Sequence, residues 1–243
     1  MNQKTNKSNS LSHILLILAA TACTLNFAGC GPGLGEKIVV DGTEVYYDGE
    51  QVTKADAEKL GQYLKSQGFS DGTEKAVQLE KEGENWVFKM VLLPDFQKDE
   101  NTKKEFKLMC LEFSSVFDGQ PFVCHGCNDQ MESLFSVTGL SGKLVEVGST
   151  SLYHNGLDEK QLTSVVGILN DLGFNEAETT VHMSRSDAGS DFRLTCQPSL
   201  LQDEDNELFV EAKIWKEQLG QAVDSKVAIH FCDLNFETHK TVN

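Results

Sequence analysis

Cysteine and histidine stand close together at two places in the chain, and both side chains can bind a metal ion or take part in redox chemistry. The first place is Cys124-His125-Gly126-Cys127 and the second is His230-Phe231-Cys232. Two residues that are two apart on a strand point to the same face of a sheet. His125, Cys127, His230 and Cys232 are therefore candidate ligands of a zinc site.

The context of these cysteines favours a simpler interpretation. A thioredoxin-type Cys-x-x-Cys motif opens a helix, whereas this motif lies on an expected terminal strand, where Cys124 and Cys127 would point to opposite faces. Neither histidine is accompanied by a further pair of ligands at metal-binding spacing. We therefore favour half-buried histidines bonded to backbone carbonyls beside small apolar thiols. No cofactor is predicted.

A second group of polar residues is expected on the open face of the second sheet. Its members are a basic, hydrogen-bonding set: His182, Arg193, Thr195 and His230. On so acidic a chain, this patch is a candidate surface for a ligand or partner. The matching positions in the first half differ chemically, so we expect no reaction common to both halves and assign no catalytic residue; these positions are Gln78, Lys89, Val91 and His125.

Two similar helical segments position these residues and show that the chain is a tandem repeat. The segments are Thr53 to Phe69 and Asp158 to Phe174. Each begins with an N-cap residue and a capping-box partner three positions later, and each ends on Gly-Phe. Apolar residues recur along one face at helical spacing.

The elements around these helices follow the same order in both copies. Two expected strands precede each helix, with Tyr153 aligned on Tyr47. A strand, a turn, a returning strand, a second helix and a final strand follow. Phe88 and Phe192 fall on the core face of the returning strands.

This order resembles the ferredoxin-like split βαβ unit. We expect an α+β fold of two tandem ferredoxin-like repeats, each an antiparallel sheet with two helices on one face and an extra leading strand. The first repeat would span 37–138 and the second 139–243. In the alternative arrangement, the leading hairpins of the two copies pair into one continuous sheet.

The N-terminal segment has the pattern of an export signal, in which Lys4 and Lys7 precede an apolar run from Leu11 to Leu25. The following residues, Leu25-Asn26-Phe27-Ala28-Gly29-Cys30, resemble the lipobox of bacterial lipoproteins. In that family, small residues precede an invariant cysteine that receives a diacylglycerol.

The resemblance implies that residues 1–29 are removed and that Cys30 carries diacylglycerol and acyl groups, with 30–36 as a tether. Because Gly31 and not aspartate follows the cysteine, the resemblance implies the outer membrane in a bacterium with two membranes. The alternative is an ordinary secretory signal, with Cys30 a plain thiol.

Charge narrows the range of partners. The chain has a formal net charge of −16, and its removed segment would carry two lysines and no acidic residue. Nucleic acid is therefore not expected as a partner. We expect an exported, lipid-anchored cell-envelope protein that acts as a binding or structural module with an envelope protein as partner. The alternatives are a metal-binding or thiol redox protein and an envelope enzyme that uses the patch around Arg193.

Overall fold

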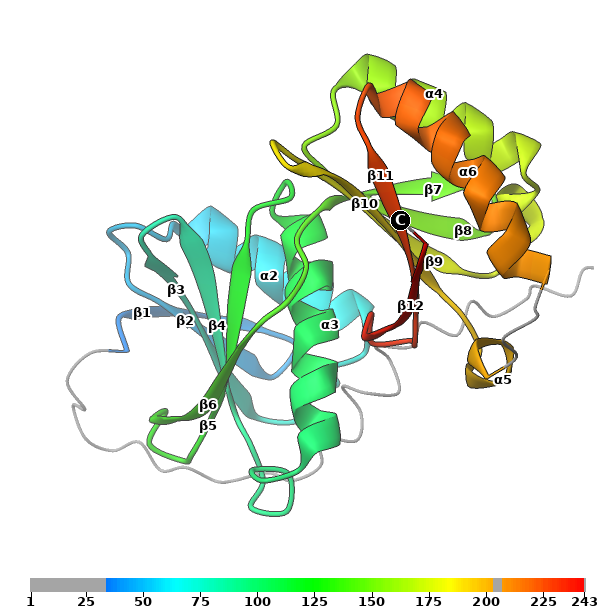
Figure 1. Ribbon diagram of the computed structural model, residues 1–243. Helices are drawn as coiled ribbons and strands as arrows, with labels where there is room; N and C mark the ends of the chain where they lie inside the picture. Colours follow the sequence, from blue (N-terminus) through cyan, green and yellow to red (C-terminus); the bar gives the residue numbers. More distant parts are fainter. Residues whose placement is uncertain (1–33, 203–206, 243) are drawn as a thin grey trace, which may run out of the picture. The chain divides into compact units, whose positions relative to one another are not determined.

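The computed structural model describes residues 34–202 and 207–242 (Figure 1). The predicted signal segment and Cys30 lie outside the described residues. The chain divides into two compact units, the first running through Val116 with Gln120–Leu140 and the second comprising Phe117–Gly119 with the chain from Ser141 onward.

Both units have the same order of strands and long helices, and the second adds two short helices, η1 and α5. The first contains β1 (Glu36–Val40), β2 (Thr43–Tyr47), α2 (Lys54–Ser66), β3 (Lys75–Glu82), β4 (Asn85–Val91), α3 (Glu100–Val116), β5 (Phe122–Cys127) and β6 (Ser133–Thr138). The second contains β7 (Lys143–Val147), β8 (Thr150–Asn155), α4 (Glu159–Asp171), η1 (Phe174–Glu176), β9 (Thr180–Ser186), β10 (Gly189–Thr195), α5 (Pro198–Leu201), α6 (Glu207–Val223), β11 (Val227–Cys232) and β12 (Thr238–Val242). The predicted α+β fold with two similar repeated units is confirmed.

The two sheets are mixed, not antiparallel as expected. Strands follow one another across each sheet in chain order, β1 to β6 and β7 to β12. Hairpin partners run antiparallel, whereas the strands that a helix connects, such as β2 and β3, are parallel neighbours. No strand separates these parallel neighbours, so the units are not split βαβ units. The leading hairpins belong to different sheets, which rules out the continuous-sheet alternative.

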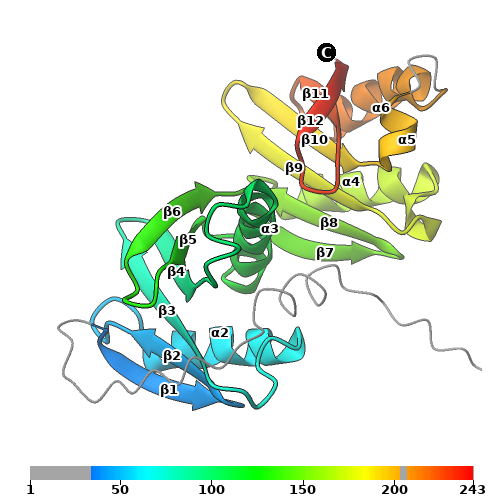
Figure 2. The ribbon, with the colours of Figure 1, turned by 90° about the horizontal axis from the view of Figure 1, so that it is seen from below.

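Both helices of each unit cover the same face of its sheet (Figures 1 and 2). In the first unit, α2 packs on β2, where a Cβ at Gly61 would lie 3.6 Å from Val45, and α3 packs on β4 through Phe113 and Phe88, whose ring centroids lie 4.6 Å apart. In the second unit, one apolar cluster contains residues of α4 and α6.

This arrangement requires helical connections of opposite hand. The connections β2–α2–β3 and β4–α3–β5 advance in the same direction across the sheet, but β2 and β4 run in opposite directions. Two right-handed connections would then place their helices on opposite faces. Because both helices lie on one face, one connection in each unit departs from the right-handed rule.

The repeated sequence features occupy equivalent structural positions. Thr53 and Asp158 form complete capping boxes with the third residue of their helices. Each helix is followed by a glycine with positive φ, Gly68 at 77° and Gly173 at 80°. Phe88 and Phe192 are fully buried in their cores. The prediction that the two copies bury equivalent side chains is therefore confirmed.

Each unit also ends in a strand that was not expected, β6 or β12, after a loop of matching geometry. Asn128 and Asp233 open these loops, and the side-chain Oδ1 of each accepts two backbone N–H groups. Met131 and Phe236 take the same position in the loop and have φ values of 61° and 60°.

Within the described ranges, no helix is both long and apolar enough to cross a membrane.

Candidate functional site

A row of polar side chains crosses the face of the second sheet that the helices leave uncovered. Cross-strand partners place its members side by side from β8 to β12: Tyr153, His182, Arg193, His230 and Thr241. Three of the four predicted patch residues lie in this row. Thr195, the fourth, lies two positions further along β10, where its Oγ1 donates to the Thr180 carbonyl at 2.9 Å. The structure therefore brings the predicted patch together.

Asp191, two positions before Arg193 on β10, bonds to two members of this row. Its two carboxylate oxygens accept from Arg193 Nη2 at 3.2 Å and from His230 Nε2 at 3.1 Å. The other ring nitrogen of His230, Nδ1, lies 3.1 Å from Thr241 Oγ1, and Arg193 Nη1 donates to Thr238 Oγ1 at 3.1 Å. The network fixes the planes of the guanidinium and imidazole groups.

His182 is held as a neutral imidazole. Its side chain is almost fully buried, and burial lowers its pKa to about 4. Its Nε2 lies 3.0 Å from the carbonyl oxygen of Ser141 and must therefore carry the proton and donate it. The other nitrogen, Nδ1, is then an acceptor.

Two buried nitrogen atoms in this row lack a hydrogen-bond partner in the part of the chain that the structure describes. They are His182 Nδ1, an acceptor, and Arg193 Nε, a donor; the Arg193 guanidinium group also hydrogen-bonds the Cys232 thiol. The two residues are direct cross-strand neighbours. Buried polar atoms are normally paired, so each of these two atoms suits a bound polar group, such as a hydroxyl or a water.

The first sheet carries a related row at the equivalent positions. Its members are Tyr46, Gln78, Lys89, His125 and Ser136. Both rows contain, in the same order, a tyrosine, a neutral polar group, a cation, a histidine and a hydroxyl. The cation partner differs, because Lys89 pairs with Glu80 on the neighbouring strand, whereas Arg193 pairs with Asp191 on its own strand.

The thiols of the two His-x-Cys pairs are fully buried. Each donates to the backbone carbonyl of its own histidine, Cys127 at 3.8 Å and Cys232 at 3.6 Å. Burial raises the pKa of Cys127 to about 11 and also raises that of Cys232, so both thiols are protonated at neutral pH. Over residues 34–202 and 207–242, no group of three or more metal-ligating side chains comes together. The zinc site stays a prediction.

Cys124 does not share a site with Cys127. It faces the core, where its thiol contacts Cys110 of α3, and burial raises its pKa well above the ordinary value. The two cysteines of the Cys-x-x-Cys motif therefore lie in different surroundings, as the strand assignment predicts.

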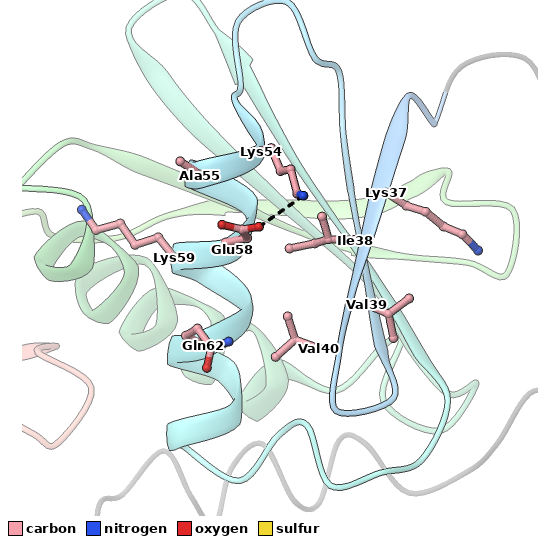
Figure 3. Close-up of a pocket in the computed structure, with 9 residues that line it drawn as sticks. All are labelled: Lys37, Ile38, Val39, Val40, Lys54, Ala55, Glu58, Lys59 and Gln62. Atoms are coloured by element: carbon pink, nitrogen blue, oxygen red, sulfur yellow. Dashed lines mark ion pairs between the residues drawn. The ribbon is translucent and has the colours of Figure 1, made fainter.

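A groove that sequence reasoning missed lies between β1 and α2 in the first unit (Figure 3). It encloses about 640 Å³ and is lined by Lys37, Ile38, Val39, Val40, Lys54, Ala55, Glu58, Lys59 and Gln62. Ile38 and Val40 point toward the helix, while Lys37 and Val39 lie on the far side of the strand (Figure 3). The groove depends on the position of β1 at the end of its sheet, and no signal in the sequence shows the strand order.

Comparison with known proteins relates the first unit to one family. Residues 37–139, from β1 to the end of β6, match the model of AF_1994_N, a family N-terminal domain. No curated protein and no solved structure matches the chain. Over its first unit, the chain is thus similar to this N-terminal domain.

Proposed function

We propose that the protein is exported, lipidated at Cys30 and held at the cell envelope, where it acts as a binding or structural module and not as an enzyme. The charged and apolar segments ahead of Ala28-Gly29-Cys30 support the anchor. Acyl chains of this kind hold a protein at a membrane without a transmembrane helix, because each buried methylene contributes about 0.8 kcal/mol.

The observation that carries the binding role is the pair of unpartnered atoms, Arg193 Nε and His182 Nδ1, in the polar row of the second sheet. A donor and an acceptor on neighbouring strands each suit the hydroxyl group of a ligand or partner protein. The Asp191 carboxylate neutralises Arg193, so the row recognises a polar neutral group more readily than a free anion. We therefore assign the outer face of the second sheet as the ligand surface.

The anchor is tested by labelling cells with a palmitate analogue. The wild-type chain should incorporate the label and fractionate with membranes, and Cys30→Ala should lose both properties. Cys110→Ala is the control, because this buried thiol lies in the core and cannot serve as the acceptor. Equal labelling of Cys30→Ala and wild type would refute lipidation at this residue.

The ligand surface is tested by photo-crosslinking in the same cells. A photoreactive residue in place of Ser184, beside Asp191 on the outer face, should give a discrete adduct that Arg193→Ala abolishes and Arg193→Lys weakens. The matched control is the same residue in place of Glu80, its equivalent in the first sheet. An adduct that persists unchanged in Arg193→Ala would show that this row does not bind the partner.

A further inference from the structure

Within residues 34–202 and 207–242, the first sheet ends at β1, next to the β1–α2 groove. Among the described residues, β1 pairs with β2 alone and stands at the end of the strand order. The outward N–H and C=O groups of such a strand are available to another strand. Four consecutive residues of β1, Lys37 to Val40, line the groove, and α2 forms its opposite wall (Figure 3). An extended peptide that adds to a sheet edge uses this kind of geometry.

The side chains of the groove suit an extended segment with alternating chemistry. Ile38 and Val40 point into the groove and form an apolar floor (Figure 3). Val39, on the other side of the strand, is 60 % exposed. Because the side chains of an added strand alternate between the two faces, every second one would pack against Ile38 and Val40.

The charges of the lining favour acidic side chains in the occupant. Lys54, Lys59 and Glu58 line the groove from α2, in a chain whose net charge is −16. Lys37 lies on the far side of β1 and pairs with Glu44 (Figure 3). Lys54 pairs with Glu58 at 3.6 Å, but both side chains are more than half exposed, so this pair is weak and easily exchanged. Lys54 is also the first residue of α2, whose N-terminus adds a partial positive charge.

A second copy of this chain fits the groove less well than an acidic partner does. Pairing β1 with β1 of another copy would bring the same lysines together and would join two strongly acidic molecules. Like charges that face each other across strands are destabilising. A partner segment with acidic residues opposite these lysines would complement their charge.

We propose that the β1–α2 groove is a binding site for an extended acidic segment of another protein, with apolar residues at alternate positions, which adds to the first sheet alongside β1. The proposal rests on the binding role proposed above and names the chemistry of a partner. It uses the first unit alone, whereas the polar row around Arg193 belongs to the second.

The second unit supplies an internal comparison. Its edge strand β7 and helix α4 occupy the places of β1 and α2. At the helix positions of the lining, Glu159 replaces Lys54, Lys160 replaces Ala55, Thr163 replaces Glu58 and Ser164 replaces Lys59, so the charges of α4 cancel. The positive charge of the groove therefore belongs to the first unit, and β7 provides matched control positions.

The test uses the full chain purified from detergent-solubilised membranes and a fluorescent peptide of alternating valine and glutamate. Binding should slow amide hydrogen exchange in β1 and should weaken as salt is raised. Lys54→Glu, which installs the residue of the second unit, should weaken binding about tenfold, equivalent to about 1.4 kcal/mol. Ile38→Lys should abolish binding, because an inward charge on an edge strand opposes strand addition.

Two peptides and one variant serve as controls. Methylating alternate backbone nitrogens of the peptide should abolish binding, since it removes the N–H groups that pair with β1. Replacing its glutamates by lysines should weaken binding. Val145→Lys, at the β7 position equivalent to Ile38, should leave the affinity unchanged.

Three results would overturn the proposal. The methylated peptide or the lysine peptide could bind as tightly as the original valine–glutamate peptide, or the peptide could slow amide hydrogen exchange only outside β1 and α2. Concentration-dependent dimerisation that Ile38→Lys abolishes, without peptide binding, would assign the edge to a second copy instead. If the peptide does not bind but the Arg193-dependent photo-crosslinked adduct is still formed, the groove is not the binding site and the proposed function stands.

Discussion

Burial of His182 makes the second unit sensitive to acid. Its pKa falls from the ordinary 6.5 to about 4 in the folded protein, because the ring is almost fully buried. The unfolded chain therefore binds a proton between these two values that the folded chain does not bind. Folding loses stability as the pH falls below 6.5, and the loss from this residue is complete near pH 4.

Replacing His182 by glutamine should remove this dependence. Glutamine is the residue at the equivalent position in the first unit, Gln78, which is also buried. Urea unfolding of wild type should show a free energy of unfolding that falls by about 3 kcal/mol more, between pH 7 and pH 4, than that of His182→Gln. The control is His239→Gln, at a half-exposed position. Parallel pH profiles of wild type and His182→Gln would show that His182 does not titrate as its burial implies.

At the scale of the element, the capping boxes of α2 and α4 give a matched pair of predictions. Thr53→Ala and Asp158→Ala each remove the side chain that accepts the N–H of the third helical residue, at Asp56 and Gln161. Each variant should lose about 1 kcal/mol of unfolding free energy, measured by urea denaturation. Thr163→Ala, within α4, should cost nothing, because alanine has the higher helix propensity. A similar loss in Thr163→Ala would attribute the effect to general disruption of the helix.

The first helix and the returning strand of each unit could be predicted, because the residues that specify them lie within or next to the element itself. Capping residues, Gly-Phe endings and alternating apolar residues identified both first helices and the returning strands around Phe88 and Phe192. The last strands, β6 and β12, were missed because their side chains are largely exposed; β12 is mostly polar, and the alternation in β6 is limited to Phe135 and Val137. Strand order was also missed, because alternation specifies a face of the sheet and not a neighbour.

The polar row shows the same limit within the candidate site. His182, Arg193 and His230 were placed on one face from alternation alone, which the pairing confirms. Tyr153 was aligned on Tyr47 by matching glycines of the two hairpins, whereas the cross-strand partners place it with Tyr46. A shift by one residue moves a side chain to the other face. The sequence therefore aligned the three central positions of the two rows and missed the tyrosines and hydroxyls at their ends.

At the scale of the whole molecule, duplication produced two sheets that retain the same interior and differ on their surfaces. The order tyrosine, polar group, cation, histidine and hydroxyl persists across both outer faces. The ion pairs of the cations differ, and so do the charges beside the edge strands β1 and β7. Surface residues diverged while the core stayed equivalent, as expected if each unit must still fold around its own apolar cluster.

Because each unit has its own core, we predict that a core substitution in one unit destabilises that unit alone. Phe192 packs in a cluster whose members all belong to the second unit. Phe192→Ala should destabilise this unit by about 3–5 kcal/mol, since it leaves a cavity in a closely packed core. Hydrogen exchange followed by mass spectrometry should then show faster exchange in residues 143–242 and unchanged exchange in β1 to β6.

The reciprocal variant completes this prediction. Phe88→Ala should accelerate exchange in β1 to β6 and leave the second unit unchanged, because Phe88 packs against Phe113 of its own unit. Mutations in cores that share no side chains should also add, so the double variant should show the sum of the two patterns. Acceleration of both units by either single variant would mean that the chain unfolds as one cooperative body. The repeat would then describe its ancestry and not its folding units.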